Sequence, residues 1–513
     1  MTNGRFSPHL APVLILLWFA QPGSARAAEP PPGPGIGLVE VIRMMLDHDP
    51  NVSIGESRLR SSQGALLSSR GIFDPVVNAG LTERELNDPL SEVASREQSI
   101  LTNSLGMTKL FRTGLSIEPE LQLSRTADTG RQDVNLGTFS FTLRQPLLRG
   151  RGREFTAAPE LSAELQVAAS VLDLRQTTSE RALAVVAQYW EARAAVLNLA
   201  ILQESEDRAR ELMETTRKLI EADVTPAADL VQVEANVVSK ETARIGGERD
   251  LFAARQALGR EIGLEPARIA ALPLPSDPFP TLPAAAALPG GDVSRWIAVA
   301  VERRSDLQAA RERQSAAEVL RKAADQALQP QLDLLFTPSY SGLVEGSDAD
   351  SFLGPLYRNI PGAASLLSLS LSWPTQNSRA RGDLAQIEAV REQNELLEEL
   401  ITRQIGANVP IAVDAVVRGA QQLERAQEAV RLFERAVENE EKKLRAGTST
   451  LIDVISQRDR LTSARQSQVA SHFALAVAIA QLRFETGTLL PGDVRGVQAL
   501  HLTTLPFQAG DEP

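Results

Sequence analysis

Residues with catalytic or metal-binding chemistry are scarce in this chain and do not cluster. The four histidines stand at positions 9, 48, 472 and 501, and there is no cysteine. Asp47-His48-Asp49 is the one suggestive group, but adjacent residues at a helix end point in different directions and do not converge on one ion. No phosphate-binding glycine loop or nucleophile elbow occurs. The sequence therefore predicts no enzyme activity, no cofactor and no metal site.

Carboxylates in two similar segments are the remaining candidates for chemistry. The segment IEADVTPAADLV around Asp229 matches LRAGTSTLIDVI around Asp453, and the two aspartates lie 224 positions apart (453 − 229). Each aspartate stands in the first turn of a long predicted helix, where a carboxylate suits the helix dipole and caps free N–H groups. The alternative is that carboxylates from several chains meet in a pore and attract cations. The sequence leaves both roles open.

Two further pairs of landmarks indicate that the chain is a duplication. Pro75 and Pro330 follow similar helix-like segments 255 positions apart, and Pro146 and Pro374 come next, 228 positions apart. The repeat divides the chain into six parts. These are a leader at 1–27, a Pro-rich segment at 28–37, a first copy at 38–264, a Pro-rich linker at 265–291, a second copy at 292–490 and a tail at 491–513.

Each copy is predicted to hold a helix, a β region and a long helical hairpin. The β segments lie within 75–145 and 330–373, and the hairpins at 154–264 and 376–487. The first β region has room for four segments, roughly 75–85, 100–111, 115–126 and 135–145, and the second has room for two. Whether the additional segments join the others or fold elsewhere stays open. Apolar residues spaced by seven along the returning helices indicate coiled-coil packing.

The β segments alternate between large apolar residues and small hydroxylated ones. The large members are Phe139, Phe141 and Leu143 in the first copy, and Leu367, Leu369, Leu371 and Trp373 in the second. Such alternation over about 9–11 residues is typical of transmembrane β-barrel strands, whose apolar face meets lipid. A strand of a soluble sandwich has the same period. Because a few strands cannot close a barrel and an open edge is not tolerated in lipid, a barrel would have to be shared between chains.

The N-terminal stretch has the layout of a secretory signal peptide. Arg5 precedes an apolar run from Val13 to Ala20, and Ala25-Arg26-Ala27 supplies small residues at the cleavage positions. The run is too short to span a bilayer, although a membrane anchor is the alternative. No later run of about 18 apolar residues occurs, so no transmembrane helix is predicted. The formal net charge of −12 argues against a nucleic-acid partner.

These features together resemble the TolC-like outer-membrane efflux proteins. The matching residues are FDP and QPQL at the strand entries, QPLLRG at a strand exit, SDLQAA at the start of the second copy, and RAGTSTLIDV. The resemblance implies a mainly helical duplicated protomer. It also implies a homotrimer with a 12-stranded barrel in outer-membrane lipid, continued by a long α-helical barrel into the periplasm. The implied function is a passive exit duct that docks to a periplasmic adaptor and an inner-membrane pump.

The resemblance also implies where the periplasmic tip and gate lie. The tip motif falls on Gly447 and Asp453 in the second copy; in the first, Asp223 replaces the glycine and Asp229 matches the acid. Some family members carry a further acid where this chain has Ser456. The family's arginine and tyrosine latch positions are Ser449 and Leu444 here, so that latch is expected to be absent.

Two other functional classes compete with the exit duct. A periplasmic adaptor also uses a long helical hairpin, but it would have one hairpin and soluble β-domains after it. A periplasmic coiled-coil scaffold would leave the alternating strands unexplained. The two hairpins, each preceded by amphipathic strands, favour the duct.

Overall fold

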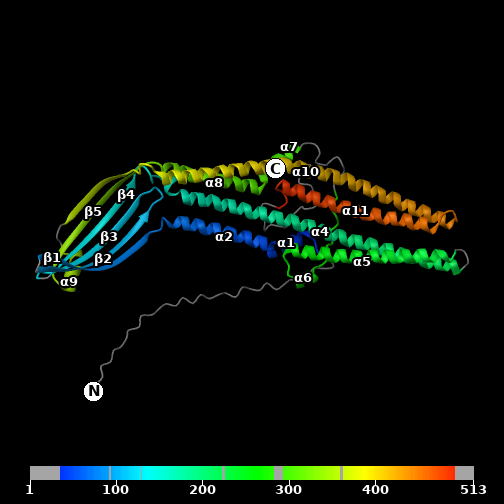
Figure 1. Cartoon of the computed structure of the whole chain (residues 1–513), viewed down its shortest axis with the longest axis horizontal. Helices are drawn as coiled ribbons and strands as arrows, with labels where there is room; N and C mark the ends of the chain where they lie inside the picture. The colour runs from blue at the N-terminus through cyan, green and yellow to red at the C-terminus, as the bar shows by residue number, and fades with distance from the viewer. Residues whose placement is uncertain are drawn as a thin grey trace, which may run out of the picture.

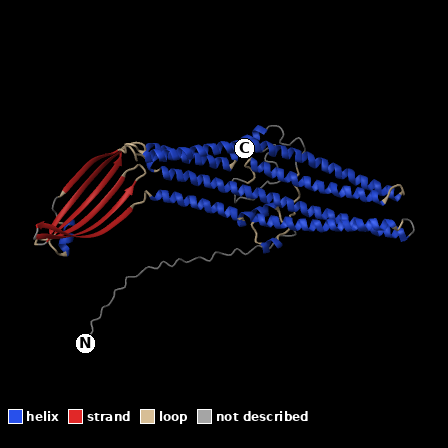
Figure 2. Ribbon diagram, in the orientation of Figure 1, coloured by secondary structure: helices blue, strands red, loops and turns tan. Residues whose placement is uncertain are grey.

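The computed structural model describes residues 35–91, 94–128, 130–221, 226–281, 293–358 and 362–490. The predicted leader, most of the Pro-rich segment after it, residues 282–292, Asp223 and the tail at 491–513 lie outside these residues. The described chain is elongated, with a β-sheet at one end and long helices running away from it (Figures 1 and 2).

Helices make up most of the fold. The first half of the chain holds α1 (Leu38–His48), α2 (Pro50–Gly71), α3 (Arg153–Thr156), α4 (Ala158–Glu221), α5 (Ala228–Ile262) and α6 (Pro266–Ala270). The second half holds α7 (Val293–Arg303), α8 (Ser305–Gln326), α9 (Ala349–Leu353), the 3₁₀ helix η2 (Gly354–Leu356), α10 (Ser378–Arg445) and α11 (Leu451–Glu485). With 64 and 68 residues, α4 and α10 each reach about 100 Å, because the rise is about 1.5 Å per residue.

The two longest helices, α4 and α10, organise the bundle. Near the sheet, α2 packs on α4, α4 on α8, and α8 on α10. Farther from the sheet, α5 returns along α4 and α11 returns along α10, while α11 also contacts α4. The two hairpins therefore run together and turn at the end of the molecule opposite to the sheet (Figure 1).

The main apolar core lies where α1 crosses α4 and α5. Its centre is Trp190 of α4, which is 1% exposed and stacks on Phe279 at 5.2 Å between ring centroids. Neighbouring Tyr189 donates its hydroxyl hydrogen to the Ile36 carbonyl oxygen at 3.0 Å and accepts from the Asp277 N–H at 3.2 Å. Burial raises the pKa of the Tyr189 hydroxyl, so it remains a neutral donor. The core thus ties α1 and the segment after α6 to the middle of α4.

A second core joins α7 and α8 to the middle of α10 and α11. Its α10 members include Ile405, Val409 and Val413. By length and composition α10 alone among the described helices is apolar enough to cross a membrane, and 28% of its most apolar 18-residue window is buried. One such helix is weak evidence for a span, because the core helix of a soluble protein also passes this test. The packed core covers Ile405, Val409, Ala412, Val413 and Val416 of α10, whereas Ile411 is 67% exposed.

The six strands found among the described residues form one antiparallel sheet in sequence order. They are β1 (Val76–Ser91), β2 (Ala94–Leu110), β3 (Ser116–Asp128), β4 (Val134–Pro146), β5 (Gln331–Glu345) and β6 (Ala363–Ser372). The four strands before α4 and the two before α10 agree with the number of segments expected. The additional strands, left open by the sequence, pair with the others in the same sheet. Strands β1 and β2 also pair well beyond the expected segments, from Glu85↔Ser99 on to Ser91↔Ala94.

A half-buried histidine is expected to make the stability of the bundle depend on pH. His472 of α11 stacks on Phe279 at 5.4 Å between ring centroids, and its Nδ1 has no hydrogen-bond partner among the described residues. Burial lowers the pKa of this imidazole. The unfolded chain therefore takes up the proton more readily than the folded chain.

We expect stability to be full above the unfolded pKa of about 6.5 and to decline as the pH falls from there through the lower folded pKa. Thermal unfolding of the purified protein between pH 8 and 5 measures this. In His472→Phe, which retains the ring stacking without a titratable group, the loss of melting temperature below pH 6.5 should be smaller. An equal loss in both proteins would contradict the assignment.

Candidate functional site

One face of the sheet is apolar across all six strands. Directly paired residues share a face, and the register connects Ala79, Leu105, Leu121, Phe139, Tyr340 and Ala363 from β1 to β6. The predicted residues of β4 and β6 lie on this face: Phe139, Phe141, Leu143, Leu367, Leu369 and Leu371. Trp373 follows β6 directly. Leu367 is 70% exposed and Trp373 67%, so the face has no cover there within the described chain.

The opposite face is lined mainly by hydroxyls and charges. Cross-strand hydroxyl pairs join Thr138 to Ser341 and Thr142 to Thr337, each at 3.1 Å between oxygens. Nearer the helices, Arg144 donates to Asp333 Oδ2 at 2.6 Å. The β-sheet therefore has one face suited to lipid and one suited to water, which is the polarity of a barrel wall.

The turn between α10 and α11 is a compact, capped structure. Gly447 adopts φ 73°, the left-handed conformation that glycine takes without strain. The N–H of Thr448 donates to the Lys443 carbonyl oxygen at 3.0 Å, which completes the end of α10. The predicted glycine therefore has a clear backbone role in the turn.

Asp453 closes a capping box with Thr450 at the start of α11. The Thr450 N–H and hydroxyl donate to Asp453 Oδ2 at 3.2 and 2.6 Å, and the Asp453 N–H donates to Thr450 Oγ1 at 3.3 Å. The Thr450 hydroxyl is the main reason that the pKa of the Asp453 carboxyl is lowered. The capping role expected from the sequence is present, and it holds the carboxylate ionised at an exposed position.

Other predicted tip residues differ in their surroundings. Asp229 lies half-buried in the first turn of α5, its N–H donating to the Pro226 carbonyl oxygen at 3.1 Å. Ser456 lies half-buried on α11 in the turn after Asp453.

Ser449, at the expected latch position, donates to Glu440 Oε1 at 2.5 Å within its own hairpin. That hydrogen bond lowers the pKa of the Glu440 carboxyl. Glu440 and Thr450 escaped the sequence analysis, although T-x-x-D at 450–453 is a recognisable capping signal.

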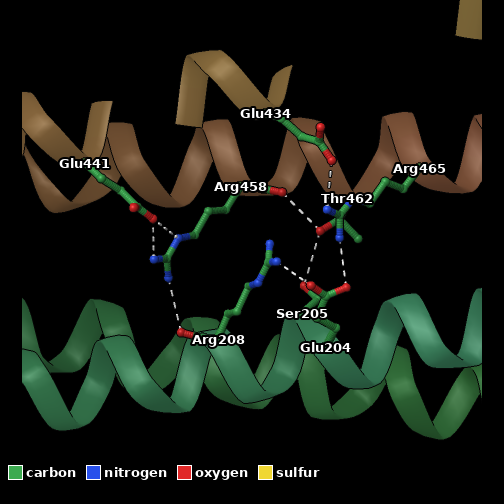
Figure 3. A network of polar contacts seen from close by, with 8 residues as sticks. All are labelled: Glu204, Ser205, Arg208, Glu434, Glu441, Arg458, Thr462 and Arg465. Carbon is green, nitrogen blue, oxygen red and sulfur yellow. Dashed lines mark hydrogen bonds and ion pairs between the residues drawn. The ribbon is translucent and has the colours of Figure 1, made fainter. Parts of the chain in front are cut away.

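Charged side chains connect the two hairpins above the tip (Figure 3). Arg458 of α11 donates to Glu441 at 2.6 Å and to the Arg208 carbonyl oxygen of α4 at 3.2 Å. Arg465 bridges Glu204 of α4 at 2.8 Å and Glu434 of α10 at 3.0 Å. We call Arg208, Glu204, Glu434, Glu441, Arg458 and Arg465 the inter-hairpin network. Lys240 of α5 also meets Asp459 of α11 at 2.5 Å. Sequence patterns did not predict this network, because the residues that it joins across the two hairpins lie about half a chain apart.

Metal-binding geometry does not occur in the part of the chain that the structure describes: no three His, Asp or Glu side chains converge on one point there. At the tip, the Asp453 carboxylate accepts from Thr450 and Ser449, and the Glu440 carboxylate accepts from Ser449 and Lys443.

Solved outer-membrane channels have the same fold. The Campylobacter jejuni CmeC outer membrane channel is 14% identical at a TM-score of 0.63, over 88% of this chain and 85% of that one. The Vibrio cholerae outer membrane protein VceC is 17% identical at 0.60, over 88% and 96%. The Neisseria gonorrhoeae MtrE outer membrane channel, in its open state, is 16% identical at 0.60, over 89% and 90%. No family model and no curated protein matches the sequence. The fold of this chain is therefore TolC-like.

The capping box makes a prediction about local stability. Asp453→Ala should fray the start of α11 and speed amide hydrogen exchange at 451–454, whereas Asp453→Asn should stay close to the native rate, since asparagine caps nearly as well as aspartate. For the native chain, the lowered pKa means that this contribution is full above the unfolded pKa of about 3.9 and is lost as the pH falls through the folded value. Equal exchange in the two variants would refute the capping role.

Proposed function

We propose that the chain is one protomer of a trimeric outer-membrane exit duct. The observation that carries this proposal is the single sheet with one apolar and one polar face, continued by two long helical hairpins in a TolC-like fold. A wall with such polarity suits lipid on one side and water on the other. It would stand in the outer membrane, with the helices extending into the periplasm.

The duct would be passive and would depend on other proteins for energy. The resemblance of RAGTSTLIDV and the strand-entry motifs to efflux proteins supports a periplasmic adaptor and an inner-membrane pump as partners. The adaptor alternative is less favoured, because this chain has two hairpins whose helices continue from strands of one sheet. The hairpin turns at Asp229 and Gly447 would form the periplasmic entrance.

The inter-hairpin network offers a way to hold that entrance closed. Its contacts join α11 to α4 through Arg458 and Arg465, whose side chains are about one quarter exposed. Water can replace the partners of such half-buried ion pairs more readily than it can replace the contacts of an apolar core. A gate made by parting the hairpins would break these contacts and leave the two apolar cores intact.

Arginine substitutions on the two faces of β6 test the membrane assignment. Leu369→Arg should reduce the yield of assembled trimer, since an arginine toward mid-bilayer lipid costs about 2–4 kcal/mol. Ser370→Arg is the matched control, one residue away on the polar face, and should assemble normally. The yield is measured as the heat-modifiable oligomer in the outer-membrane fraction. Similar yields from both variants would count against the barrel wall.

Neutralising the tip aspartates tests the entrance. Asn at both Asp229 and Asp453 keeps capping ability but removes six negative charges per trimer, so cation selectivity and block by divalent ions should both weaken. Planar-bilayer recordings measure the reversal potential and the block, with Asp207→Asn as a control for removing a carboxylate farther from the turn. Unchanged selectivity in a correctly assembled double variant would leave these aspartates with capping alone.

A further inference from the structure

The sheet has two open edges that match each other. Among the residues that the structure describes, β1 pairs only with β2 and β6 only with β5, so each has backbone N–H and C=O groups without a strand partner along its outer side. We propose that β6 of one copy pairs with β1 of the next, and that three copies close a barrel of 18 strands (3 × 6). This inference rests on the proposed trimeric duct, and it departs from the 12-stranded barrel that the family resemblance implies.

Strand direction permits this closure. Strand β1 leaves the helical bundle after α2, and β6 returns to it before α10, with every neighbouring pair in between antiparallel. With six strands, β6 runs against β1 of the next copy, so the antiparallel pattern continues around the ring without interruption. A closed wall leaves no edge in lipid, where unpaired backbone groups are not tolerated.

The β1–β2 hairpin is built as part of the wall and not as an appendage. Strand β2 pairs with β3 from Gln98↔Asp128 to Leu110↔Ser116, as extensively as β3 pairs with β4. The apolar face also continues onto the hairpin through Val77, Ala79 and Leu81, and Leu81 is 71% exposed. A hairpin outside the barrel would need neither the pairing nor an apolar face on the same side as Phe139.

The helical layer next to the sheet fits a wall of this size. Four helices of each copy, α2, α4, α8 and α10, pack side by side there. Twelve helices spaced about 8–10 Å apart have a circumference of roughly 100–120 Å. Eighteen strands about 4.8 Å apart and tilted by about 35–45° have a circumference of roughly 105–120 Å, whereas twelve strands give only about 70–80 Å at the same tilt.

The stagger of the sheet predicts the register at the closure. The row of directly paired residues that crosses the sheet runs from Ala79 in β1 to Ala363 in β6. Ala79 lies three residues from the helix-side end of β1, and Ala363 lies nine residues from the helix-side end of β6. If the helix-side ends of all strands are level, each copy contributes a stagger of six residues (9 − 3). Over 18 strands this corresponds to a tilt of about 35°, which is the tilt found in such barrels. Ser372 then faces Val76 of the next copy, and Ser370 faces Asn78.

This register also matches the two faces. Leu369 lies opposite Ala79 of the next copy, and Leu371 lies opposite Val77, so apolar residues meet on the lipid side. Ser370 and Asn78 meet on the polar side, and both are exposed in the single chain. A shift by one residue would put serines against valine and alanine and break both faces.

Disulfide cross-linking tests whether β6 of one copy pairs with β1 of the next. Because the chain has no cysteine, only the introduced cysteines can form a disulfide. Ser370→Cys combined with Asn78→Cys should link neighbouring copies under mild oxidation and shift the boiled, unreduced protein from monomer to covalent trimer. The two single variants are the matched controls and should stay monomeric after boiling. Migration of the unboiled samples shows whether each variant has assembled.

A competing pair distinguishes a 12-stranded wall. With the β1–β2 hairpin outside the barrel, β6 would meet β3 of the next copy, and the same level-end argument places Ser370 opposite Glu118. Cross-linking of Ser370→Cys with Glu118→Cys, or of neither pair in an assembled trimer, would overturn the 18-stranded closure. Absence of any trimer in the unsubstituted protein would instead reject the proposed duct, so the two failures are distinguishable.

Discussion

The backbone hydrogen bonds at the edges of one sheet are the constraint on which the rest of the structure depends. A single chain satisfies the inner sides of β1 and β6 and leaves their outer sides to be paired elsewhere. In water an exposed edge is a liability; in lipid it is not viable, because nothing there can hydrogen-bond to it. The apolar face from Ala79 to Leu371 suits such a lipid setting, which is the one we propose. Oligomerisation is thus a condition for the fold to exist in a membrane, and the helices inherit whatever symmetry the strands adopt.

The interactions that hold the two hairpins together change along the length of the bundle. In the middle, Trp190 and Ile405 lie in extensive apolar cores, and Arg304 is buried in an ion pair with Glu485 at 2.5 Å. Breaking such contacts exposes apolar surface or leaves a buried charge without its partner, and both are costly. Toward the tip, the hairpins meet through Arg458 and Arg465, and water can replace these contacts. In the proposed duct, the apolar cores would therefore hold the middle of the bundle together while the hairpins part at the tip.

Local patterns predicted the elements well, and contacts between distant segments poorly. The period-two alternation around Phe139 and Leu369 fixed which residues share a face, since side-chain direction along a strand is set by neighbours. It underestimated β1 and β2, because their outer halves pair through polar residues such as Glu85 and Ser99 that carry no apolar signal. The inter-hairpin network was not predictable either: nothing in the residues near Arg458 indicates that its partner is the Arg208 carbonyl oxygen.

The two interpretations of the tip aspartate are physically compatible. Among the described residues, every hydrogen bond to the Asp453 carboxylate reaches Oδ2, from Thr450 and Ser449. Those donors fix the rotamer and hold the pKa below its usual range, so the charge persists wherever the folded tip persists. No described residue donates to Oδ1, and Asp453 is exposed. A pore needs carboxylates that stay ionised and ordered when several are brought together, although mutual repulsion would otherwise raise their pKa values and scatter their side chains. The cap supplies both conditions, so capping is compatible with the role at the entrance that we propose for this carboxylate.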